Sequence, residues 1–351
     1  MRIAIVGCGY WGHNHLRLMR QSSHVEKIVV VEPDPVSRAR LAYISGIDVV
    51  SDLTSALSVT DAAIIATPPR THAAVALECL TAGKDVLVEK PLATSLDEAQ
   101  RLVELAADRG LTLMVGHTFE YNAGVRKLRD LMQSGELGDT YYIDCARLNL
   151  GRYQSDVNVI WDLAPHDISI ANYLLNREPS QVQAWGAANV RDGVEDVATL
   201  RLKYESPNIV VQICLSWLAP QKVRRVTVVG SRKMAVYDDL LDDERIKVFD
   251  KHAEAPQLGD GDGLASVTYH NGGVMSPYVQ FEEPLRVLDE HFLECLEFGL
   301  PVQTPGESGL SVVRVIEAAQ SSLCRGGAAV APSTDADSSL GPMTSRLIAS
   351  W

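Results

Sequence analysis

The stretch that decides the fold is RIAIVGCGYWG, residues 2–12. A short apolar run leads into Gly7, Gly9 and Gly12, which have the spacing G-x-G-x-x-G, and the residues that follow show helical apolar spacing. In such a strand–turn–helix unit the first glycine permits the tight turn, the second lets a pyrophosphate approach the backbone, and the third lets helix and strand pack closely. The helix N-terminus offers unpaired N–H groups to the phosphates. We therefore predict a dinucleotide site, against the alternative of a tight turn that binds no ligand.

Short apolar runs and helical segments alternate through the first 120 residues. The apolar runs occupy 2–7, 27–32, 48–52, 61–67, 85–90 and 112–117. Apolar residues recur at helical spacing between them, for example in 72–82 and 95–109. Continuous apolar runs joined by helices are typical of a parallel sheet that is covered on both faces. The sequence thus predicts an α/β protein with an N-terminal NAD-binding Rossmann domain over residues 1–120.

The texture changes after residue 140, where long β-like runs follow one another closely. These runs are 197–204, 208–217, 223–230 and 233–238. Short turns join them, which indicates a mostly antiparallel sheet. We predict that residues 121–330 form a second α/β domain with a large, mostly antiparallel open sheet.

Helices and loops complete this second part of the chain. Helical spacing is found over about 162–176, 284–299 and 307–325. Residues 251–283 are rich in Gly, Asp, His and Pro and predict a long irregular loop. Residues 331–351, which are mostly small and polar, predict a loose tail or an arm that packs on a neighbour.

Composition limits the classes of partner. With 351 residues the chain is long for one core, which agrees with two domains. Its formal net charge of −13 argues against binding nucleic acid, or an anionic membrane surface, through a general basic face. No run of about 18 apolar residues is present, so no membrane span is expected. The six cysteines form no C-x-x-C pair and mostly lie in apolar runs, which indicates buried thiols and a cytoplasmic protein.

The residue that ends the second apolar run bears on the choice of cofactor. Glu32 follows Gly12 at the interval expected for the acidic residue of a dinucleotide site. A carboxylate there accepts hydrogen bonds from the ribose hydroxyls and would repel a 2′-phosphate, so NAD is favoured over NADP. Asp34 is an alternative carboxylate, and Arg38 and Arg40 lie near enough to leave NADP open.

The sequence ATPPRTH, residues 66–72, follows the fourth run. Its two prolines predict a rigid loop at the carboxyl edge of the sheet, where ligands of such sheets bind. His72 has the alternative of a helix-start residue with no ligand role. The expected cofactor contacts are Gly7, Gly9, Tyr10, Trp11, Gly12, Glu32, Thr67, Pro68, His72, Glu89 and Lys90.

Two short motifs carry candidate catalytic side chains. VLVEKPL places Lys90 at the carboxyl end of the fifth strand, and the rigid proline after it argues that the side chain points inward. WDLAPHDI places Asp162 and His166 one helical turn apart. Asp162 could instead be an N-cap, with Pro165 in the first helical turn, or the pair could be half of a metal site. No third ligand stands at a characteristic spacing, so no metal is predicted.

Taken together, GCGYWG, ATPPRTH, EKPLA and the mid-chain Asp-x-x-x-His resemble the Gfo/Idh/MocA oxidoreductases, and EEPLRVLDEHFLECLEFGLPVQTPGESGLSVVRVIEAA resembles their closing helices. The resemblance implies a Rossmann domain followed by an α/β domain whose open sheet joins subunits, hence a homodimer or homotetramer. It also implies NAD(P)-dependent interconversion of a secondary alcohol and a ketone on a small-molecule sugar or cyclitol, with Lys90, Asp162 and His166 as catalytic residues. One departure is the lead-in VNVIW, where many members are rich in glycine.

The residue types agree with these roles. Oxidising an alcohol removes a hydride from carbon and a proton from oxygen, and the imidazole of His166 suits the second task near neutral pH. Lys90 could share the proton or polarise the developing carbonyl. Asp162 could orient either the substrate or the imidazole.

The segment RLNLGRYQSDVN, residues 147–158, bears on the substrate. Its Arg and Asn side chains could bind sugar hydroxyls or a diphosphate, with an exposed basic strand edge as the alternative. Together with WDLAPHDISI, it resembles the subgroup that acts on nucleotide-linked amino sugars, which implies chemistry at C3. Alternatives are a free cyclitol, a sugar of an aminoglycoside, and a non-catalytic NAD-binding regulator.

We expect His117, Phe119 and Tyr121, which lie at and just after the end of the sixth apolar run, to be beside the nicotinamide. Tyr121 could instead belong to the core. The full set of expected substrate contacts is Lys90, His117, Phe119, Tyr121, Arg147, Asn149, Arg152, Asp162 and His166.

Overall fold

The computed structural model describes residues 1–151, 153–154, 157–254 and 267–333, and these fall into two compact units. Unit 1 comprises Met1–Tyr121 and Glu282–Glu317. Unit 2 comprises Asn122–Phe281 and Ala318–Ser333. The late segment Glu282–Glu317 thus packs with the N-terminal part of the chain, whereas the sequence pattern assigns it to the second domain.

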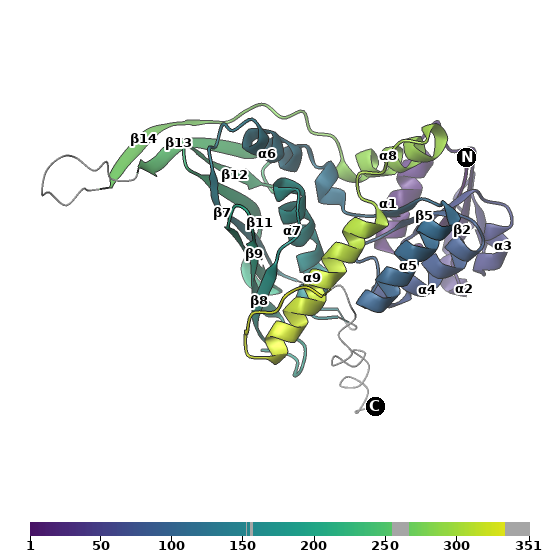
Figure 1. The fold of residues 1–351 in the computed structure, drawn as a ribbon. Helices are drawn as coiled ribbons and strands as arrows, with labels where there is room; N and C mark the ends of the chain where they lie inside the picture. The colour runs from purple at the N-terminus through teal and green to yellow at the C-terminus, as the bar shows by residue number, and fades with distance from the viewer. Residues whose placement is uncertain (152, 155–156, 255–266, 334–351) are drawn as a thin grey trace, which may run out of the picture. The chain divides into compact units, whose positions relative to one another are not determined.

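Unit 1 is built on a six-stranded, all-parallel sheet with the order β3-β2-β1-β4-β5-β6. Its strands are β1 (Arg2–Val6), β2 (Lys27–Val31), β3 (Asp48–Val50), β4 (Ala62–Ile65), β5 (Asp85–Val88) and β6 (Leu113–Val115). The connecting elements are α1 (Tyr10–Met19), α2 (Pro35–Leu41), α3 (Leu53–Leu57), α4 (Pro69–Thr81) and α5 (Leu96–Arg109), and η1 (Thr118–Tyr121) follows β6. This is the predicted Rossmann arrangement, in which the buried strands are apolar because helices cover both faces (Figure 1).

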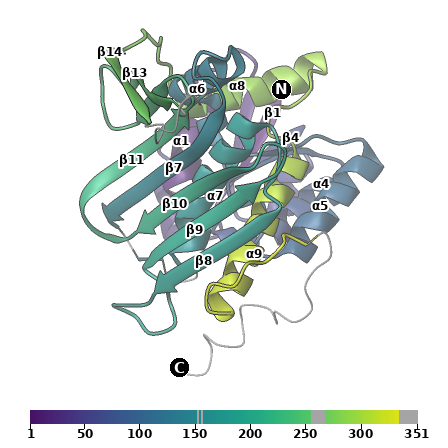
Figure 2. The same ribbon diagram turned by 60° about the vertical axis from the view of Figure 1, so that its left-hand side comes forward.

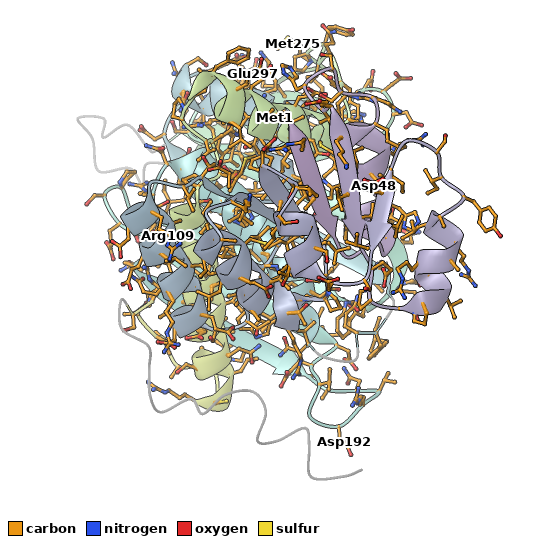
Figure 3. All side chains as sticks on the ribbon, turned by 90° about the vertical axis from the view of Figure 1, so that its right-hand side faces the viewer. Met1, Asp48, Arg109, Asp192, Met275 and Glu297 are labelled. Atoms are coloured by element: carbon orange, nitrogen blue, oxygen red, sulfur yellow. The ribbon has the colours of Figure 1, made fainter. Side chains whose placement is uncertain are left out.

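Helix α8 (Pro284–Phe298) completes the core of unit 1. Its Leu288, Phe292 and Leu293 belong to the same buried cluster as Ile3 and Leu16. Figure 3 shows Glu297, near the end of this helix, close to the first residue of the chain. Because α8 packs on α1 and η1, it can supply side chains to the dinucleotide turn from late in the sequence.

Unit 2 is built on an eight-stranded sheet with the order β14-β13-β12-β11-β7-β10-β9-β8. Its strands are β7 (Thr140–Leu150), β8 (Gln181–Ala187), β9 (Val197–Tyr204), β10 (Ile209–Ser216), β11 (Leu218–Gly230), β12 (Met234–Asp238), β13 (Ile246–Glu254) and β14 (Thr268–Met275). The pairs are antiparallel except β7 with β10. The prediction of a large, mostly antiparallel sheet is confirmed, and Figure 2 shows its open face.

Helices of unit 2 lie on one side of this sheet. Helix α7 (Val159–Leu175) packs on β10, β7 and β9, and α6 (Ala123–Gln133) packs on α7 and β12. Helix α9 (Gly306–Cys324) begins in unit 1 and ends in unit 2. The helix expected to start near Asp162 begins at Val159 instead, because Asn158 is its N-cap and accepts a hydrogen bond from the Trp161 N–H.

The expectation of an irregular loop over residues 251–283 is wrong in part. β13 and β14 pair as an antiparallel ribbon across Lys251–Asn271 and Glu254–Thr268. β14 is an exposed edge strand with two glycines, so it lacks the alternating apolar pattern by which a strand is recognised. Backbone hydrogen bonds, which leave no mark on the sequence, hold it in the sheet. The loop between the two strands and most of the predicted tail lie outside the described residues.

In the part of the chain that the structure describes, no helix is both long and apolar enough to cross a membrane.

Candidate active site

The glycine turn between β1 and α1 has the geometry that its spacing predicts. Gly7 has φ +84°, a backbone conformation that side chains rarely adopt. A Cβ on Gly12 would lie 2.1 Å from the Gly7 carbonyl oxygen, so only glycine permits the close packing of helix on strand. A Cβ on Gly9 would meet nothing within 4 Å, so the space beside this residue is open to a ligand. Tyr10 and Trp11 begin α1 with side chains that are 78% and 39% exposed.

The carboxylate after β2 faces this turn. Glu32 accepts hydrogen bonds from the backbone N–H of Cys8 at 3.3 Å and of Asp34 at 3.1 Å. The alternatives from the sequence have other partners. Asp34 is the N-cap of α2, and Arg38 donates to the backbone carbonyls of Glu32 and Pro33. Glu32 is thus the carboxylate that the structure brings to the glycine turn.

The loop after β4 is held by a buried histidine. His72 lies in α4 with its Nδ1 2.7 Å from the Pro91 carbonyl oxygen and its Nε2 2.8 Å from the Thr67 carbonyl oxygen. Burial lowers the pKa of His72. Both ring nitrogens therefore face the protein, which favours a structural role over a direct cofactor contact. The Thr67 hydroxyl, in contrast, is buried without a hydrogen-bond partner among the described residues. Pro68 is the N-cap residue of α4.

The segment after β5 is fixed by a buried chain of three ionisable residues. The Glu89 carboxylate lies 3.1 Å from Nε2 of His15 in α1, and Nδ1 of His15 lies 2.8 Å from a carboxylate oxygen of Asp289 in α8. None of the three residues is more than 5% exposed. The other oxygen of Glu89 accepts the backbone N–H of Lys90 at 3.2 Å. Three elements that are distant in sequence thus meet beneath the candidate catalytic lysine.

The charges in this chain are strongly perturbed. Burial by itself favours neutral histidine, but the charges and hydrogen bonds of Asp289 and Glu89 outweigh it and raise the pKa of His15 to about 10. Burial likewise opposes the ionisation of Glu89, yet the hydrogen bond from His15 lowers its pKa. Burial raises the pKa of Asp289. The positive charge therefore resides on His15, between the carboxylates of Asp289 and Glu89.

The three substrate contacts expected after β6, His117, Phe119 and Tyr121, lie in different environments. His117 is 1% exposed and neither ring nitrogen has a hydrogen-bond partner among the described residues. Burial lowers the pKa of His117 to about 4, so its imidazole is neutral. Phe119 is half-buried in η1. Tyr121 lies in the core, where its hydroxyl contacts the Thr304 hydroxyl at 3.1 Å.

In unit 2, the candidate Asp and His lie on successive turns of α7. Asp162 is half-buried and its carboxylate accepts the indole N–H of Trp217 at 3.0 Å. His166 is half-buried one turn later. The N-cap interpretation of Asp162 is wrong, because Asn158 occupies that position, and Pro165 lies inside the helix and not in its first turn.

The predicted polar residues on β7 have different environments. Arg147 is 6% exposed and binds Asp167 of α7 through two nitrogens, at 2.8 and 3.0 Å. This buried pair shows that Arg147 is not an exposed basic strand edge, and no local sequence pattern points to Asp167 as its partner. Asn149 has a buried side-chain oxygen with no hydrogen-bond partner among the described residues. Arg152 lies outside the described residues.

Several residues of the site were missed by sequence reasoning. His15 contacts the predicted residue Glu89, Trp217 contacts the predicted residue Asp162, and Asp289 contacts His15. The position of His15, three residues after the last glycine of the turn, is the one local signal that could have drawn attention to it. Asp289 and Trp217 have no such signal, because their partners lie far away in the chain.

Comparison with known proteins agrees with this geometry. Residues 1–117 match the model of an oxidoreductase family with an NAD-binding Rossmann fold, and residues 125–236 match that of the GFO/IDH/MocA C-terminal domain. A UDP-N-acetylglucosamine 3-dehydrogenase from Acidithiobacillus ferrooxidans is 30% identical over 241 residues, which are 68% of this chain and 74% of that protein. An inositol 2-dehydrogenase from Rhodococcus erythropolis is 32% identical over 190 residues, 52% of this chain and 55% of that protein. A crystal structure from Magnetospirillum magnetotacticum MS-1, described as an oxidoreductase, has a TM-score of 0.76 at 30% identity and covers 91% of this chain and 99% of that one.

Proposed function

The chain belongs to the Gfo/Idh/MocA family of NAD-binding oxidoreductases, and from that premise we propose that it interconverts a secondary alcohol and a ketone at C3 of a nucleotide-linked sugar. The observation that carries this proposal lies in unit 1. The glycine turn, the Lys90 segment and the unsatisfied imidazole of His117 follow β1, β5 and β6 of one parallel sheet. Ligands of such sheets bind at the carboxyl ends of the strands. The similarity to a UDP-N-acetylglucosamine 3-dehydrogenase supports this class of substrate.

The residues of the glycine turn fit a dinucleotide. The space beside Gly9 is open to a pyrophosphate, and the Thr67 hydroxyl is buried without a partner among the described residues. The nicotinamide, when bound, supplies the hydride acceptor. Glu32 favours NAD over NADP, since it would receive the ribose hydroxyls and repel a 2′-phosphate. Arg38, the nearby candidate for a 2′-phosphate, is already bonded to two backbone carbonyls.

The cofactor preference has a direct test. Glu32→Ala should lower the ratio of kcat/KM for NAD to that for NADP at least about tenfold, because it removes both the acceptor and the repulsion. Glu104→Ala is the matched control, since Glu104 is an exposed carboxylate of α5. A ratio unchanged in Glu32→Ala would overturn the assignment.

The proposed roles divide between the ionisable side chains. During oxidation the hydroxyl proton of the substrate passes to Nε2 or Nδ1 of His166 and then to water, and a bound nicotinamide would accept the hydride of the substrate C–H bond. Lys90 polarises the developing carbonyl oxygen through its ammonium group. Asp162, held by Trp217, orients the hydroxyl that reacts. His117 and Asn149 offer buried polar atoms to neighbouring hydroxyls.

The activity can be tested by absorbance of the reduced nicotinamide. Purified protein with NAD is offered UDP-, dTDP- and GDP-linked hexoses, free inositols and aminoglycosides, and the reverse reaction is followed with the matching ketones. Turnover of a nucleotide-linked sugar, with the 3-keto product identified by mass spectrometry, is the expected result. Failure of every nucleotide-linked sugar in both directions would overturn the proposal.

A pair of lysines separates catalysis from stability. Lys90→Ala should reduce kcat by at least about 1,000-fold while NAD binding persists, because the lost group acts on the reacting oxygen. Lys84 precedes β5, at the opposite edge of the sheet, and donates to the Thr60 carbonyl. Lys84→Ala should keep the turnover of the parent. Equal turnover in the two variants would remove Lys90 from the mechanism.

A free cyclitol is the second candidate substrate. It is favoured by the inositol 2-dehydrogenase relative, which is 32% identical over its aligned region. The two candidates differ in the nucleotide, so UDP competes with a nucleotide-linked sugar and not with inositol. Turnover of inositol that is insensitive to UDP would select the cyclitol.

We further propose that the open face of the unit 2 sheet joins two copies of the chain. Tyr142 and Trp185 lie on this face, on the side away from α7, with side chains 42% and 49% exposed. Light scattering after size exclusion should give twice or four times the chain mass, and Trp185→Lys should reduce it. A monomer at micromolar concentration would contradict the proposal.

A further inference from the structure

The buried hydrogen-bond chain Glu89–His15–Asp289 joins helices α1 and α8 to the Lys90 segment. We infer that His15 is a positioning residue: it holds Glu89 and, through Glu89, the backbone of Lys90, while Asp289 orients its ring. The inference concerns the reaction proposed above and rests on the role given there to Lys90. All three residues and Lys90 belong to unit 1.

With Glu89 and Asp289 ionised, the hydrogen-bond chemistry requires a charged imidazole at His15. Both ring nitrogens of His15 face carboxylate oxygens, at 2.8 Å and 3.1 Å. An ionised carboxylate only accepts hydrogen bonds, and a neutral imidazole can donate only one. Both contacts are therefore hydrogen bonds to ionised groups when His15 is an imidazolium. This arrangement also neutralises Glu89, a carboxylate that is only 5% exposed and would be costly to bury without a counter-charge.

The position of Glu89 is constrained on its other side as well. Its second oxygen accepts the Lys90 backbone N–H at 3.2 Å. A Cβ on Gly116 would lie 3.2 Å from that same oxygen, so the carboxylate lies directly against the backbone after β6. Held between the His15 ring and these backbones, the carboxylate fixes the direction in which the chain leaves β5. The direction of the backbone at this point determines where the Lys90 side chain starts.

The same histidine belongs to the helix that receives the pyrophosphate. α1 begins at Tyr10, directly after Gly9, and His15 lies in its second turn. A rigid α1 therefore fixes both the N-terminus that faces the phosphates and the ring that holds Glu89. Asp289 ties this assembly to α8, which is why a helix from late in the sequence matters to a site near the N-terminus.

The charges around the chain determine what removal of His15 would do. Lys90, His72 and His117 face Glu89, and Arg17 and Glu290 face Asp289. With a neutral residue at position 15, the negative charge of Glu89 would act on Lys90 without compensation. An adjacent negative charge favours the ammonium form of a lysine. Replacing Glu89 by glutamine should have the opposite effect.

Competitive labelling tests this prediction without requiring turnover. The protein is treated with a trace of acetic anhydride between pH 6 and pH 11, and the acetylated Lys90 peptide is measured by mass spectrometry relative to the Lys84 peptide. His15→Gln should move the pH midpoint of Lys90 labelling upward by about one unit, and Glu89→Gln should move it downward. A residue that merely stabilises the fold would not shift the two midpoints in opposite directions.

Kinetics supply the second readout. His15→Gln should lower kcat at least about tenfold while the dissociation constant of NAD changes less than about threefold, since the glycine turn is untouched. His24→Gln is the control, because His24 is also paired with carboxylates but contacts Glu290 and Glu297 of α8 and not Glu89. Asp289→Asn, which keeps an oxygen for the His15 ring, serves if His15→Gln does not fold, and it should lower kcat less.

The outcomes distinguish this inference from the proposed function. If the labelling midpoints shift as expected but the protein turns over no sugar, the positioning role of His15 is supported and the proposed substrate class is rejected. Turnover and labelling that both stay at the parent values in His15→Gln would overturn the inference and leave the proposed function standing.

Discussion

The indole N–H of Trp217 donates to the Asp162 carboxylate across 3.0 Å. Trp217 follows β10 and is 1% exposed, whereas Asp162 lies on α7, which packs on that strand. The bond orients a half-buried carboxylate whose two adjacent residues, Trp161 and Leu163, are apolar. Trp217 is therefore the residue on which the proposed role of Asp162 most directly depends.

Trp217→Phe should lower kcat about ten- to a hundredfold. A hydrogen bond to a charged group contributes about 1.5–3 kcal/mol, and each 1.36 kcal/mol corresponds to a factor of ten in rate. The measurement is kcat and KM for the substrate that the panel identifies, together with the thermal midpoint. Trp185→Phe, which changes an exposed indole of β8, is the control. A Trp217→Phe enzyme with the kcat of the parent would show that Asp162 needs no such support.

Two glycines of the dinucleotide turn should respond differently to the same substitution. Gly9→Ala adds a Cβ that meets no protein atom within 4 Å, so the thermal midpoint should stay within about 2 °C of the parent. The methyl group would occupy the approach of the pyrophosphate, and the NAD dissociation constant should rise at least about tenfold. Gly12→Ala should lower the thermal midpoint as well, because its Cβ would lie 2.1 Å from a carbonyl oxygen. Calorimetric titration and thermal unfolding decide the matter; unchanged NAD affinity in Gly9→Ala would contradict the assigned site.

The buried Arg147–Asp167 pair makes a prediction about stability. Arg147→Leu should destabilise unit 2 by about 3–5 kcal/mol, since it leaves the Asp167 carboxylate buried without its partner. The double variant Arg147→Leu/Asp167→Leu should regain most of that loss. Urea unfolding followed by tryptophan fluorescence measures both. The folded double variant also tests Arg147 as a substrate ligand: a KM raised more than about tenfold would restore that role.

The hydrogen-bond chain Glu89–His15–Asp289 predicts how stability depends on pH. The pKa of His15 is about 10 in the folded protein against an ordinary value of 6.5, so its contribution is complete below pH 6.5 and is lost as the pH rises toward 10. The thermal midpoint of the parent should therefore fall more steeply over this window than that of His15→Gln. Parallel curves for the two proteins between pH 6.5 and pH 10 would mean that His15 carries no charge in the fold.

The spacing of apolar residues along the sequence was sufficient to predict much of the architecture. The parallel strands of unit 1 and the strands β9 to β12 are apolar at the positions that become buried, so runs such as 27–32 and 197–204 could be assigned directly. The glycine spacing identified the dinucleotide turn because the requirement for glycine is local at both positions: Gly7 has a positive φ, and a Cβ on Gly12 would clash with the Gly7 carbonyl oxygen. β14 escaped prediction because an exposed edge strand has no apolar period.

By itself, then, the sequence determined the two kinds of sheet, the glycine turn with its carboxylate at Glu32, and the candidate residues Lys90, Asp162 and His166. Only the tertiary structure decided the partners of the buried charges: Arg147 with Asp167, and His15 with both Glu89 and Asp289. The physical reason is that periodicity and turn chemistry act over a few residues, whereas burying a charge requires an opposite charge from wherever the fold supplies one. His15 and Asp289 are separated by 274 positions in the chain, and no local pattern relates them.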